Sequence, residues 1–343
     1  MKHLLNTLFV MTENAYLSLD GENVVVSHGK TTIGRFPLHT LKGIISFSYA
    51  GASPALMGAC GERGISLAFC SPRGRFLSRS VGKTSGNVLL RRTQYRVADD
   101  PSESCRIARN FIFGKVFNCR WSIERTKRDH ELRVKVENLD TASQALQQAL
   151  PQIAEETSLD SLRGLEGTAA TVYFAVFDDL ILGDQKVFHF KGRNRRPPLD
   201  PVNALLSFSY SLLANDCAAA LESVGLDPYV GFLHRDRPGR ASLALDLMEE
   251  LRPCMADRFV LTIINTRKLM GKDFQTSESG AVLLTDNARK TFLQAWQSRK
   301  IEEITHPYLH EKLPWGMVPF IQALLLTRYL RGDMDGYPPF LWK

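Results

Sequence analysis

GKTSGNVLLRRTQYRV, residues 82–97, marks the place where this 343-residue sequence changes character. Before it, short runs rich in β-branched and aromatic residues alternate with turn signals, a pattern typical of strands. After Gly86-Asn87, apolar residues recur at helical spacing along much longer segments. A chain of this length also exceeds one typical domain. We therefore predict an α+β protein with two domains, a β-rich sheet or sandwich over residues 1–88 and a larger all-helical domain over residues 89–343.

The N-terminal domain is expected to contain several short strands around one short helix. Turn signals at Asp20-Gly21 and His28-Gly29 separate the early strands. Small residues and suitable length predict a helix at Pro54–Arg63. The strands are expected at Leu4–Met11, Ala15–Leu19, Asn23–Ser27, Ile44–Ser48 and Ile65–Cys70.

The C-terminal domain is expected to be built from long helices without internal repeats. A Pro-rich tail, YPPFLWK, follows the last of them. The helices are expected at Val88–Val97, Ser102–Lys115, Glu131–Gln148, Leu159–Asp178, Val202–Val224, Ser242–Thr266, Asn287–Ser298 and Pro319–Leu330.

The composition is that of a soluble globular protein, with 44% hydrophobic and 23% charged residues. No apolar run approaches the roughly 18 residues of a membrane-spanning helix. The N-terminal segment lacks the apolar length and small-residue cleavage site of a signal peptide, so we expect a cytoplasmic protein with no membrane partner. Six scattered cysteines without a C-x-x-C pair favour buried free thiols over a zinc site or disulfides.

The positive charge is unevenly distributed. The net charge is +7, and residues 63–98 contain eight basic residues and no acidic one. Further arginines cluster at residues 193–196 and 235–240. Clustered cations suit a polyphosphate partner such as nucleic acid, because each neutralised phosphate releases condensed counterions. A solvated basic face is the alternative interpretation.

The segment GFLHRDRPGRASLALDLMEELRP, residues 231–253, contains the most informative predicted helix. Ser242 is a suitable N-cap for a helix that begins at Leu243. At about 100° per residue, the leucines at 243, 247 and 251 form one apolar stripe.

Three acidic residues of that helix gather on another side. Asp246 is three residues before Glu249 and four before Glu250, so either pair can face one point. A solvated acidic face would explain the pattern equally well for an average helix. However, His234 lies just upstream in an arginine-rich loop, and this combination favours a site that holds a divalent cation and a phosphodiester together.

A second unusual segment is LRGLEGTAATVYF, residues 162–174. Gly164 and Gly167 lie inside a predicted helix, where each glycine costs about 1 kcal/mol relative to alanine. The simplest reason is the close approach of another helix. Glu166 lies between the two glycines and could be neutralised by an arginine such as Arg163.

Taken together, these segments resemble the CRISPR-associated integrase family, the universal endonuclease of spacer acquisition. The resemblance covers essentially the whole chain, because the order, spacing and local context of several segments agree at once. They include the β-rich start, LRGLEG…AA…YF, RRPPLDPVNALLSFSYSLL at residues 195–213 and GFLH…SLALDLMEELRP. The C-terminal LRGDMDGYPPFLWK is similar to the tail of type I-C members.

The resemblance implies the residues of a metal site. The metal ligands would be Glu166, His234 and Glu249, with Asp246 beside the metal and also needed for catalysis. The sequence leaves Glu250 as an alternative to Glu249 for the third ligand position. The ion would be Mg²⁺ or Mn²⁺, since carboxylates suit both and an imidazole ligand suits Mn²⁺.

The resemblance also implies the reaction and the partners. The 3′-hydroxyl of a captured double-stranded DNA fragment would attack a phosphodiester at the boundary of a CRISPR repeat, and water as nucleophile would give an endonuclease. The chain would form a homodimer through its N-terminal domain and a heterohexamer with the small second acquisition protein. DNA-backbone contacts are expected from Arg73, Arg75, Arg91, Arg92, Arg235, Arg237, Arg240 and Arg252.

Two other functions remain compatible with the same residues. A catalytically idle scaffold would bind DNA through these arginines without metal dependence. A metal-dependent RNase would prefer ribose-containing substrates through contacts with the 2′-hydroxyl.

Overall fold

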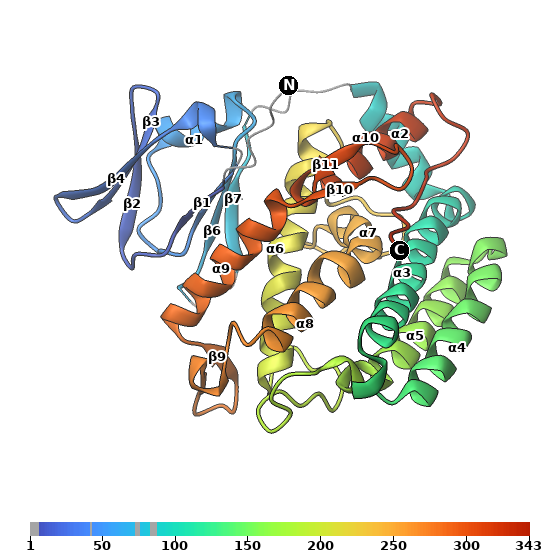
Figure 1. Ribbon diagram of the computed structural model, residues 1–343. Coiled ribbons are helices and arrows are strands. Elements are labelled where there is room, and N and C mark those ends of the chain that lie inside the picture. Colours follow the sequence, from blue (N-terminus) through green and yellow to red (C-terminus); the bar gives the residue numbers. More distant parts are fainter. Residues whose placement is uncertain (1–6, 42, 73–75, 83–87) are drawn as a thin grey trace. The chain divides into compact units, whose positions relative to one another are not determined.

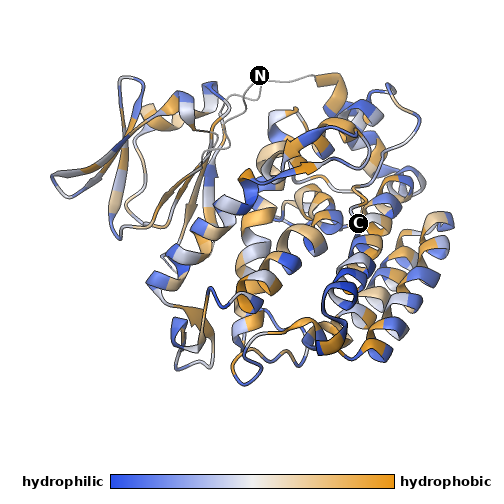
Figure 2. Cartoon of the chain, viewed as in Figure 1, coloured by the Kyte–Doolittle hydropathy of each residue, from blue (hydrophilic) through white to orange (hydrophobic). Residues whose placement is uncertain are grey.

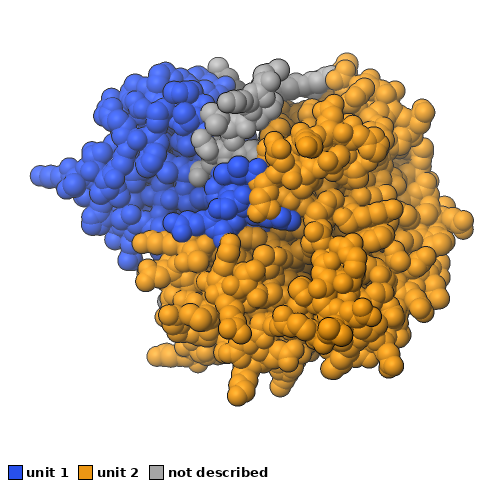
Figure 3. All heavy atoms as spheres, in the orientation of Figure 1, with its two compact units in different colours: residues 1–85, 293–301 blue, residues 86–292, 302–343 orange. Residues whose placement is uncertain are grey.

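The computed structural model describes residues 7–41, 43–72, 76–82 and 88–343 (Figure 1). Two compact units are present, coloured separately in Figure 3. The N-terminal unit comprises residues 1–85 together with residues 293–301, and the C-terminal unit comprises residues 86–292 and 302–343. A β-sheet region is thus followed by a mainly helical region, which confirms the predicted fold class.

The described part of the N-terminal unit contains two sheets, helix α1 (Pro54–Glu62) and residues 293–301 of helix α9 (Asp286–Ile301). One sheet has the order β1-β5-β6-β7, in which β6 and β7 are antiparallel and the other neighbours are parallel. The second sheet is the antiparallel meander β2-β3-β4. Helix α1 connects the parallel neighbours β5 and β6. The strands are β1 (Thr7–Val10), β2 (Ala15–Asp20), β3 (Asn23–His28), β4 (Thr31–Pro37), β5 (Gly43–Ser46), β6 (Ser66–Cys70) and β7 (Phe76–Ser80).

Local sequence signals explain this unit well. Gly21 and Gly29 adopt positive φ angles of 57° and 59° at the two hairpin turns, a conformation that glycine reaches without strain. Ser53 caps α1 by accepting a hydrogen bond from the Leu56 amide, and Pro54 occupies the first turn. The strands β4 and β7 were absent from the prediction. Every described residue of β4 is at least partly exposed, so it has no apolar signal.

The C-terminal unit consists mainly of helices, with two small β-hairpins. Helices α3, α4 and α5 pack against one another, and α7 packs against α3, α6 and α10. In Figure 2 hydrophobic and hydrophilic residues alternate along α4 and α5, as expected for helices with one buried face. The hairpins are β8 (Phe274–Thr276) with β9 (Val282–Leu284) and β10 (Glu303–Thr305) with β11 (Lys312–Pro314). The helices are α2 (Val88–Asp99), α3 (Pro101–His130), α4 (Val136–Glu155), α5 (Leu159–Ala175), α6 (Pro201–Ser223), α7 (Ser242–Leu251), α8 (Arg258–Asn265), α9 (Asp286–Ile301) and α10 (Val318–Leu330).

The predicted helix at Ser242–Thr266 is confirmed in extent, because the backbone is helical from Ser242 to Asn265. It comprises α7, a π-helical segment at Arg252–Asp257, and α8, and the π-helical segment was not predicted. Pro253 explains that segment, because it lacks the N–H that an α-helix needs and its ring clashes with the preceding turn. The predicted helix at Ser102–Lys115 was too short, since α3 continues to His130 without glycine or proline after Gly114.

Helix α6 is long and apolar enough to span a membrane by composition, yet 67% of its apolar window is buried within the protein. It is therefore a core helix of the C-terminal unit. All six cysteines lie within the described residues, are buried and form no disulfide, as predicted from their scattered positions.

The glycines of α5 do not mark a helix contact, contrary to the prediction. A Cβ atom built at Gly164 or Gly167 would meet nothing within 4 Å. The close approach instead occurs in α3, where a Cβ at Gly114 would lie 2.9 Å from the Glu250 Cβ and 3.3 Å from the Pro339 Cβ. Gly114 thus allows α3 to lie close to helix α7 and to the C-terminal tail.

Gly114→Ala should destabilise the protein although alanine is the better helix former. The added methyl group overpacks the contact with Glu250, and we expect the free energy of unfolding to fall by about 1–3 kcal/mol. Gly164→Ala is the matched control, and there the higher helix propensity of alanine should raise stability by up to about 1 kcal/mol. Urea denaturation measures both values. Stabilisation by Gly114→Ala would show that the α3–α7 contact is not tight.

Candidate active site

The three carboxylates of α7 are all buried, which excludes the solvated acidic face. Asp246 and Glu250 are fully buried and Glu249 is nearly so. A buried carboxylate is strongly disfavoured unless charges and hydrogen bonds compensate for its lost hydration. Each of the three has a separate set of partners, so they do not face one point.

The start of α7 differs from the prediction. Ser242 is the first helical residue and does not cap it, because its hydroxyl bonds the Arg235 carbonyl oxygen instead. The Pro228 carbonyl oxygen accepts hydrogen bonds from the Leu243 and Ala244 amides at 2.9 and 3.2 Å. The preceding loop therefore provides the acceptor that a capping side chain would otherwise supply.

Asp246 organises the loop that carries His234. Its Oδ2 accepts hydrogen bonds from the Phe232 and Leu233 amides at 2.6 and 2.9 Å, and its Oδ1 accepts one from the His234 amide at 3.1 Å. Gly231 makes this possible, because a Cβ there would lie 2.7 Å from Asp246 Oδ2. The aspartate thus fixes the backbone of residues 232–234.

Asp246 also orients the imidazole ring. Its Oδ1 lies 2.5 Å from His234 Nδ1, so a proton on Nδ1 leaves the Nε2 lone pair available to a ligand. The His234 side chain is partly exposed, and its Nε2 has no hydrogen bond to any part of the chain that the structure describes. Burial opposes the charged imidazole, but the hydrogen bond and charge of Asp246 outweigh it and raise the pKa of His234.

Glu166 and Glu249 converge on Lys115, a residue of α3. The Lys115 ammonium donates to Glu166 Oε1 and forms an ion pair with Glu249 Oε2 at 2.6 Å. The Lys115 side chain is only 8% exposed. Burial disfavours its charge, yet the negative charge of Glu249, and then of Glu166, raises the pKa of Lys115. Helices α3, α5 and α7 therefore bring these three groups together.

Arg252 neutralises Glu249 from the other side. Its Nη1 donates to Glu249 Oε1 at 2.7 Å, and its guanidinium lies over the Tyr210 ring, 4.3 Å from the ring centre. Although burial opposes ionisation, Arg252 and Lys115 lower the pKa of Glu249 to about 2. Glu249 Oε2 is buried, and its partner is the Lys115 ammonium at 2.6 Å.

Glu250 belongs to a different environment from its neighbour. Its Oε1 accepts hydrogen bonds from the Tyr337 hydroxyl and from Gln322 Nε2, and its Oε2 accepts one from the Phe340 amide at 2.9 Å. Burial raises the pKa of Glu250 to about 7 against the opposing effect of these donors. Its carboxylate thus binds Tyr337 and Phe340 of the C-terminal tail, together with Gln322 of α10.

The candidate ligands Glu166, His234 and Glu249 carry donor atoms of the kinds that bind divalent cations. Within the described ranges no three His, Cys, Asp or Glu side chains are grouped closely enough to hold a metal ion. Lys115 lies between Glu166 and Glu249, and the charge of His234 also lowers the pKa of Glu249. Two carboxylates and an imidazole nitrogen are donor types that Mg²⁺ and Mn²⁺ accept. The chemistry of the donors therefore fits such an ion, and the Lys115 ammonium takes the position between the two carboxylates.

Sequence reasoning missed Lys115 and misassigned the partner of Glu166. Arg163, considered for that role, donates to the Leu233 carbonyl oxygen and to Asp160 instead. It thereby holds the residue next to His234. A lysine in a helix is usually solvated, so no local pattern could have indicated that Lys115 is buried.

The arginines predicted to contact DNA have varied surroundings. Arg235 has a 74% exposed side chain, whereas Arg252 is largely buried against Glu249. Arg92 and Arg237 are exposed, and Arg91 and Arg240 are partly exposed. Arg91 donates to the Gly225 carbonyl oxygen, and Arg240 donates to the Arg235 carbonyl oxygen. Arg73 and Arg75 lie outside the described residues.

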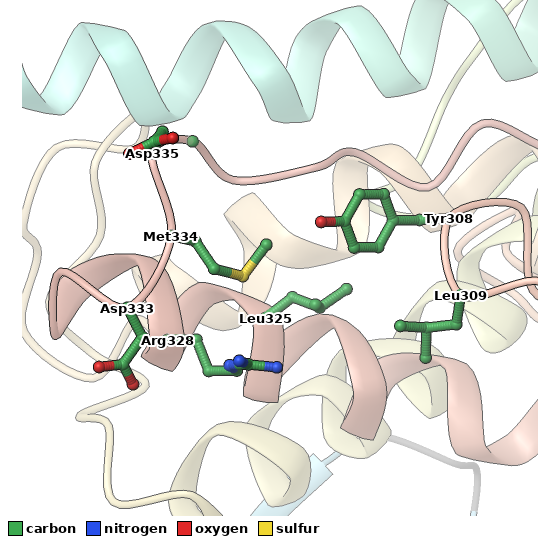
Figure 4. A pocket seen from close by; sticks show the side chains of 8 residues that line it. Tyr308, Leu309, Leu325, Arg328, Asp333, Met334 and Asp335 are labelled. Atoms are coloured by element: carbon green, nitrogen blue, oxygen red, sulfur yellow. The ribbon is translucent and has the colours of Figure 1, made fainter.

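A cavity of about 450 Å³ lies elsewhere in the C-terminal unit (Figure 4). Leu325 and Arg328 of α10 contribute to its wall, as does the segment that follows this helix. Its lining includes none of the residues predicted to act in catalysis. The lining residues are Tyr308, Leu309, Leu325, Arg328, Asp333, Met334, Asp335 and Gly336.

Comparison with known proteins identifies the family. The family described as CRISPR associated protein Cas1 matches residues 8–298. The chain belongs to the Cas1 family. It is 49% identical to a CRISPR-associated endonuclease Cas1 of Chlorobaculum tepidum over 343 residues, with both chains covered completely. It is 51% identical to another of Rhodospirillum rubrum over 351 residues, again with complete coverage of both.

Solved structures share the Cas1 fold at lower sequence identity. A casposase bound to its integration product has a TM-score of 0.83 at 22% identity, covering 98% of this chain and 93% of that one. A Cas1 protein from Thermotoga maritima has a TM-score of 0.80 at 20% identity, with 97% and 99% coverage. A Cas6-RT-Cas1–Cas2 complex gives 0.82 at 22% identity, covering 100% of this chain and 36% of that one.

Family membership establishes the activity of this Cas1 protein. It is a CRISPR-associated DNA endonuclease and integrase that serves spacer acquisition. This confirms the activity implied by the resemblance.

Glu250→Gln should reduce stability through the tail contacts. At pH 8 the carboxylate accepts bonds from two donors at Oε1 and one at Oε2, whereas the Gln amide nitrogen would face a donor. We expect the free energy of unfolding to fall by about 1–3 kcal/mol, as for a buried donor left without an acceptor. Urea denaturation measures the loss. Unchanged stability would mean that the tail is not anchored through Glu250.

Proposed function

We propose that the Cas1 reaction of this chain takes place at a divalent-metal site whose protein ligands are Glu166, His234 and Glu249. The observation that carries this proposal is the convergence of the Glu166 and Glu249 carboxylates on a single cationic position, now taken by the Lys115 ammonium. His234 Nε2, which has no hydrogen bond within the described residues, adds to it. Glu250 is not a ligand in this proposal, because its carboxylate is committed to the tail.

The protein groups have distinct tasks in this site. Asp246 keeps the proton on His234 Nδ1 and so leaves the Nε2 lone pair available to the metal ion. Arg252 holds one oxygen of Glu249, which leaves the other for the ligand position. The bound Mg²⁺ or Mn²⁺ supplies Lewis-acid activation of the scissile phosphate and stabilises the leaving oxygen. The partly exposed Glu166 and His234 form the side that a DNA strand can approach.

The substrates we infer are a captured double-stranded DNA fragment and the repeat of a CRISPR array. The 3′-hydroxyl of the fragment attacks the repeat phosphodiester, a new phosphodiester forms, and the repeat strand leaves with its own 3′-hydroxyl. The likeness to a casposase bound to its integration product supports this reaction. Exposed arginines such as Arg92, Arg235 and Arg237 provide backbone contacts.

The assembly we infer is a homodimer joined through the β-rich domain of residues 1–88, two of which flank a dimer of the small second acquisition protein. Likeness to the Cas1 part of a Cas6-RT-Cas1–Cas2 complex supports a partner of the Cas2 kind. The YPPFLWK tail supports assignment to type I-C. The protein acts in the cytoplasm, where the CRISPR array is located.

Glu166→Ala and His234→Ala should each abolish metal-dependent DNA joining. The measurement incubates the protein and its second acquisition partner with short duplex DNA and a supercoiled plasmid that carries a repeat. Mn²⁺, Mg²⁺ and a chelator are compared. Joining is expected with a metal ion only, and each alanine variant should lose at least about a hundredfold, because a ligand of a catalytic cation is removed.

Glu155→Ala is the control for that experiment, since it removes an exposed glutamate of α4. It should retain full joining activity. Joining that persists in the chelator, or in both ligand variants, would contradict the proposed site. Preference for an RNA duplex over DNA would favour the metal-dependent RNase instead.

Arg235→Gln and Arg237→Gln should weaken binding to every DNA duplex by a similar factor. Backbone contacts carry no sequence information, so repeat and scrambled duplexes should be affected equally. Each lost phosphate contact should reduce the slope of log affinity against log salt by about 1. Fluorescence anisotropy over a salt series measures both quantities. Loss confined to the repeat sequence would show that these side chains read bases.

A further inference from the structure

Lys115 bridges two carboxylates that lie far from it in the sequence. Its ammonium contacts Glu166, 51 residues away, and Glu249 on a third helix. Within the described residues, the polar contacts of its side chain are with these two residues. The lysine therefore acts on the structure through the two proposed ligands.

The charges around Lys115 are balanced without any bound ion. Glu166 and Glu249 contribute two negative charges, and Lys115 and Arg252 contribute two positive charges in the same group of contacts. Removal of one buried partner would leave a charge uncompensated, which is strongly destabilising. Helices α3, α5 and α7 are held together by this balance.

A divalent cation and the Lys115 ammonium require the same oxygen atoms. Glu249 Oε2 is 2.6 Å from the ammonium nitrogen and has no other partner. A Mg²⁺ ion would bind such an oxygen at about 2.0–2.1 Å, so both cations cannot occupy the position at once. The closeness of like charges would add repulsion to this steric conflict.

We propose that Lys115 is a resident counter-cation that occupies the position between Glu166 and Glu249 in the metal-free protein and withdraws when the divalent ion binds. This inference rests on the proposed metal site. It makes Lys115 a positioning residue: it keeps the two carboxylates together before metal binds, and it lowers the affinity for metal by competing with it.

Lys115→Gln tests the inference by metal binding and by stability. The protein is freed of metal with a chelator, Mn²⁺ is titrated calorimetrically, and melting is followed by circular dichroism with and without Mn²⁺. We expect the variant to bind Mn²⁺ at least about tenfold more tightly, because the competing charge is gone. Its melting temperature should be lower than that of the wild type without metal, and Mn²⁺ should close this gap.

Lys127→Gln is the matched control. Lys127 lies on the same helix and also bridges two carboxylates, Glu124 at 3.0 Å and Asp140 at 2.5 Å, away from the proposed ligands. Its removal should leave the Mn²⁺ affinity unchanged. Mn²⁺ affinity in Lys115→Gln that equals or falls below that of the wild type would overturn the inference.

The double variant Lys115→Gln/Glu166→Gln covers the case in which the single variant folds poorly. It removes one positive and one negative charge, so the metal-free melting temperature should recover part of the loss. No recovery would show that the lysine acts through packing, which overturns the proposal.

The two proposals fail in different ways. If wild-type protein binds no Mn²⁺, or if Glu166→Ala binds it equally well, the metal site itself is wrong. If wild-type binding depends on Glu166 and Lys115→Gln binds no more tightly, only the role of Lys115 is wrong.

Discussion

The structure depends on the burial of three carboxylates along one helix, α7. Removing such groups from water costs several kcal/mol each unless partners compensate. Asp246 is compensated by the amides and imidazole of the His234 loop, Glu249 by Lys115 and Arg252, and Glu250 by the C-terminal tail. The surrounding elements are therefore fixed relative to α7 by polar contacts as well as by apolar packing.

This arrangement links distant parts of the chain to one site. Arg163 of α5 holds the Leu233 carbonyl oxygen, next to His234, while Glu166 of the same helix reaches Lys115. The tail is joined to α3 as well, since Asn118 Nδ2 donates to the Glu250 and Phe340 carbonyl oxygens at 2.7 Å. A change in any one of these helices would be transmitted to the proposed ligands through short, directional contacts.

The sequence allowed the fold class and most elements to be predicted, because hydrophobic periodicity and turn residues are local signals. Helices α2 and α6 and the hairpin turns at Gly21 and Gly29 followed from such signals. The π-helical segment around Pro253 was not predicted, because the apolar periodicity continues through it although proline lacks an N–H. Strand β4 is at least partly exposed along its length, so its sequence lacks the alternation of apolar and polar residues by which a strand is predicted.

The proposed site was less accessible from local sequence. Spacing along α7 left Glu249 and Glu250 equivalent, and only tertiary contacts distinguish them, since one faces Lys115 and the other faces Tyr337. His234 was indicated by its position beside the acidic helix and Glu166 by family resemblance, and their ligand roles remain proposals. Lys115 gave no sequence signal, because burial of its charge depends on two residues from other helices.

Anomalous diffraction at the manganese edge, from crystals grown with Mn²⁺, tests the central claim most directly. The account predicts one strong peak bounded by Glu166, His234 Nε2 and Glu249, with the Lys115 ammonium moved away from both carboxylates. A peak at Glu250, or none near α7 with Lys115 still bridging Glu166 and Glu249, would contradict it.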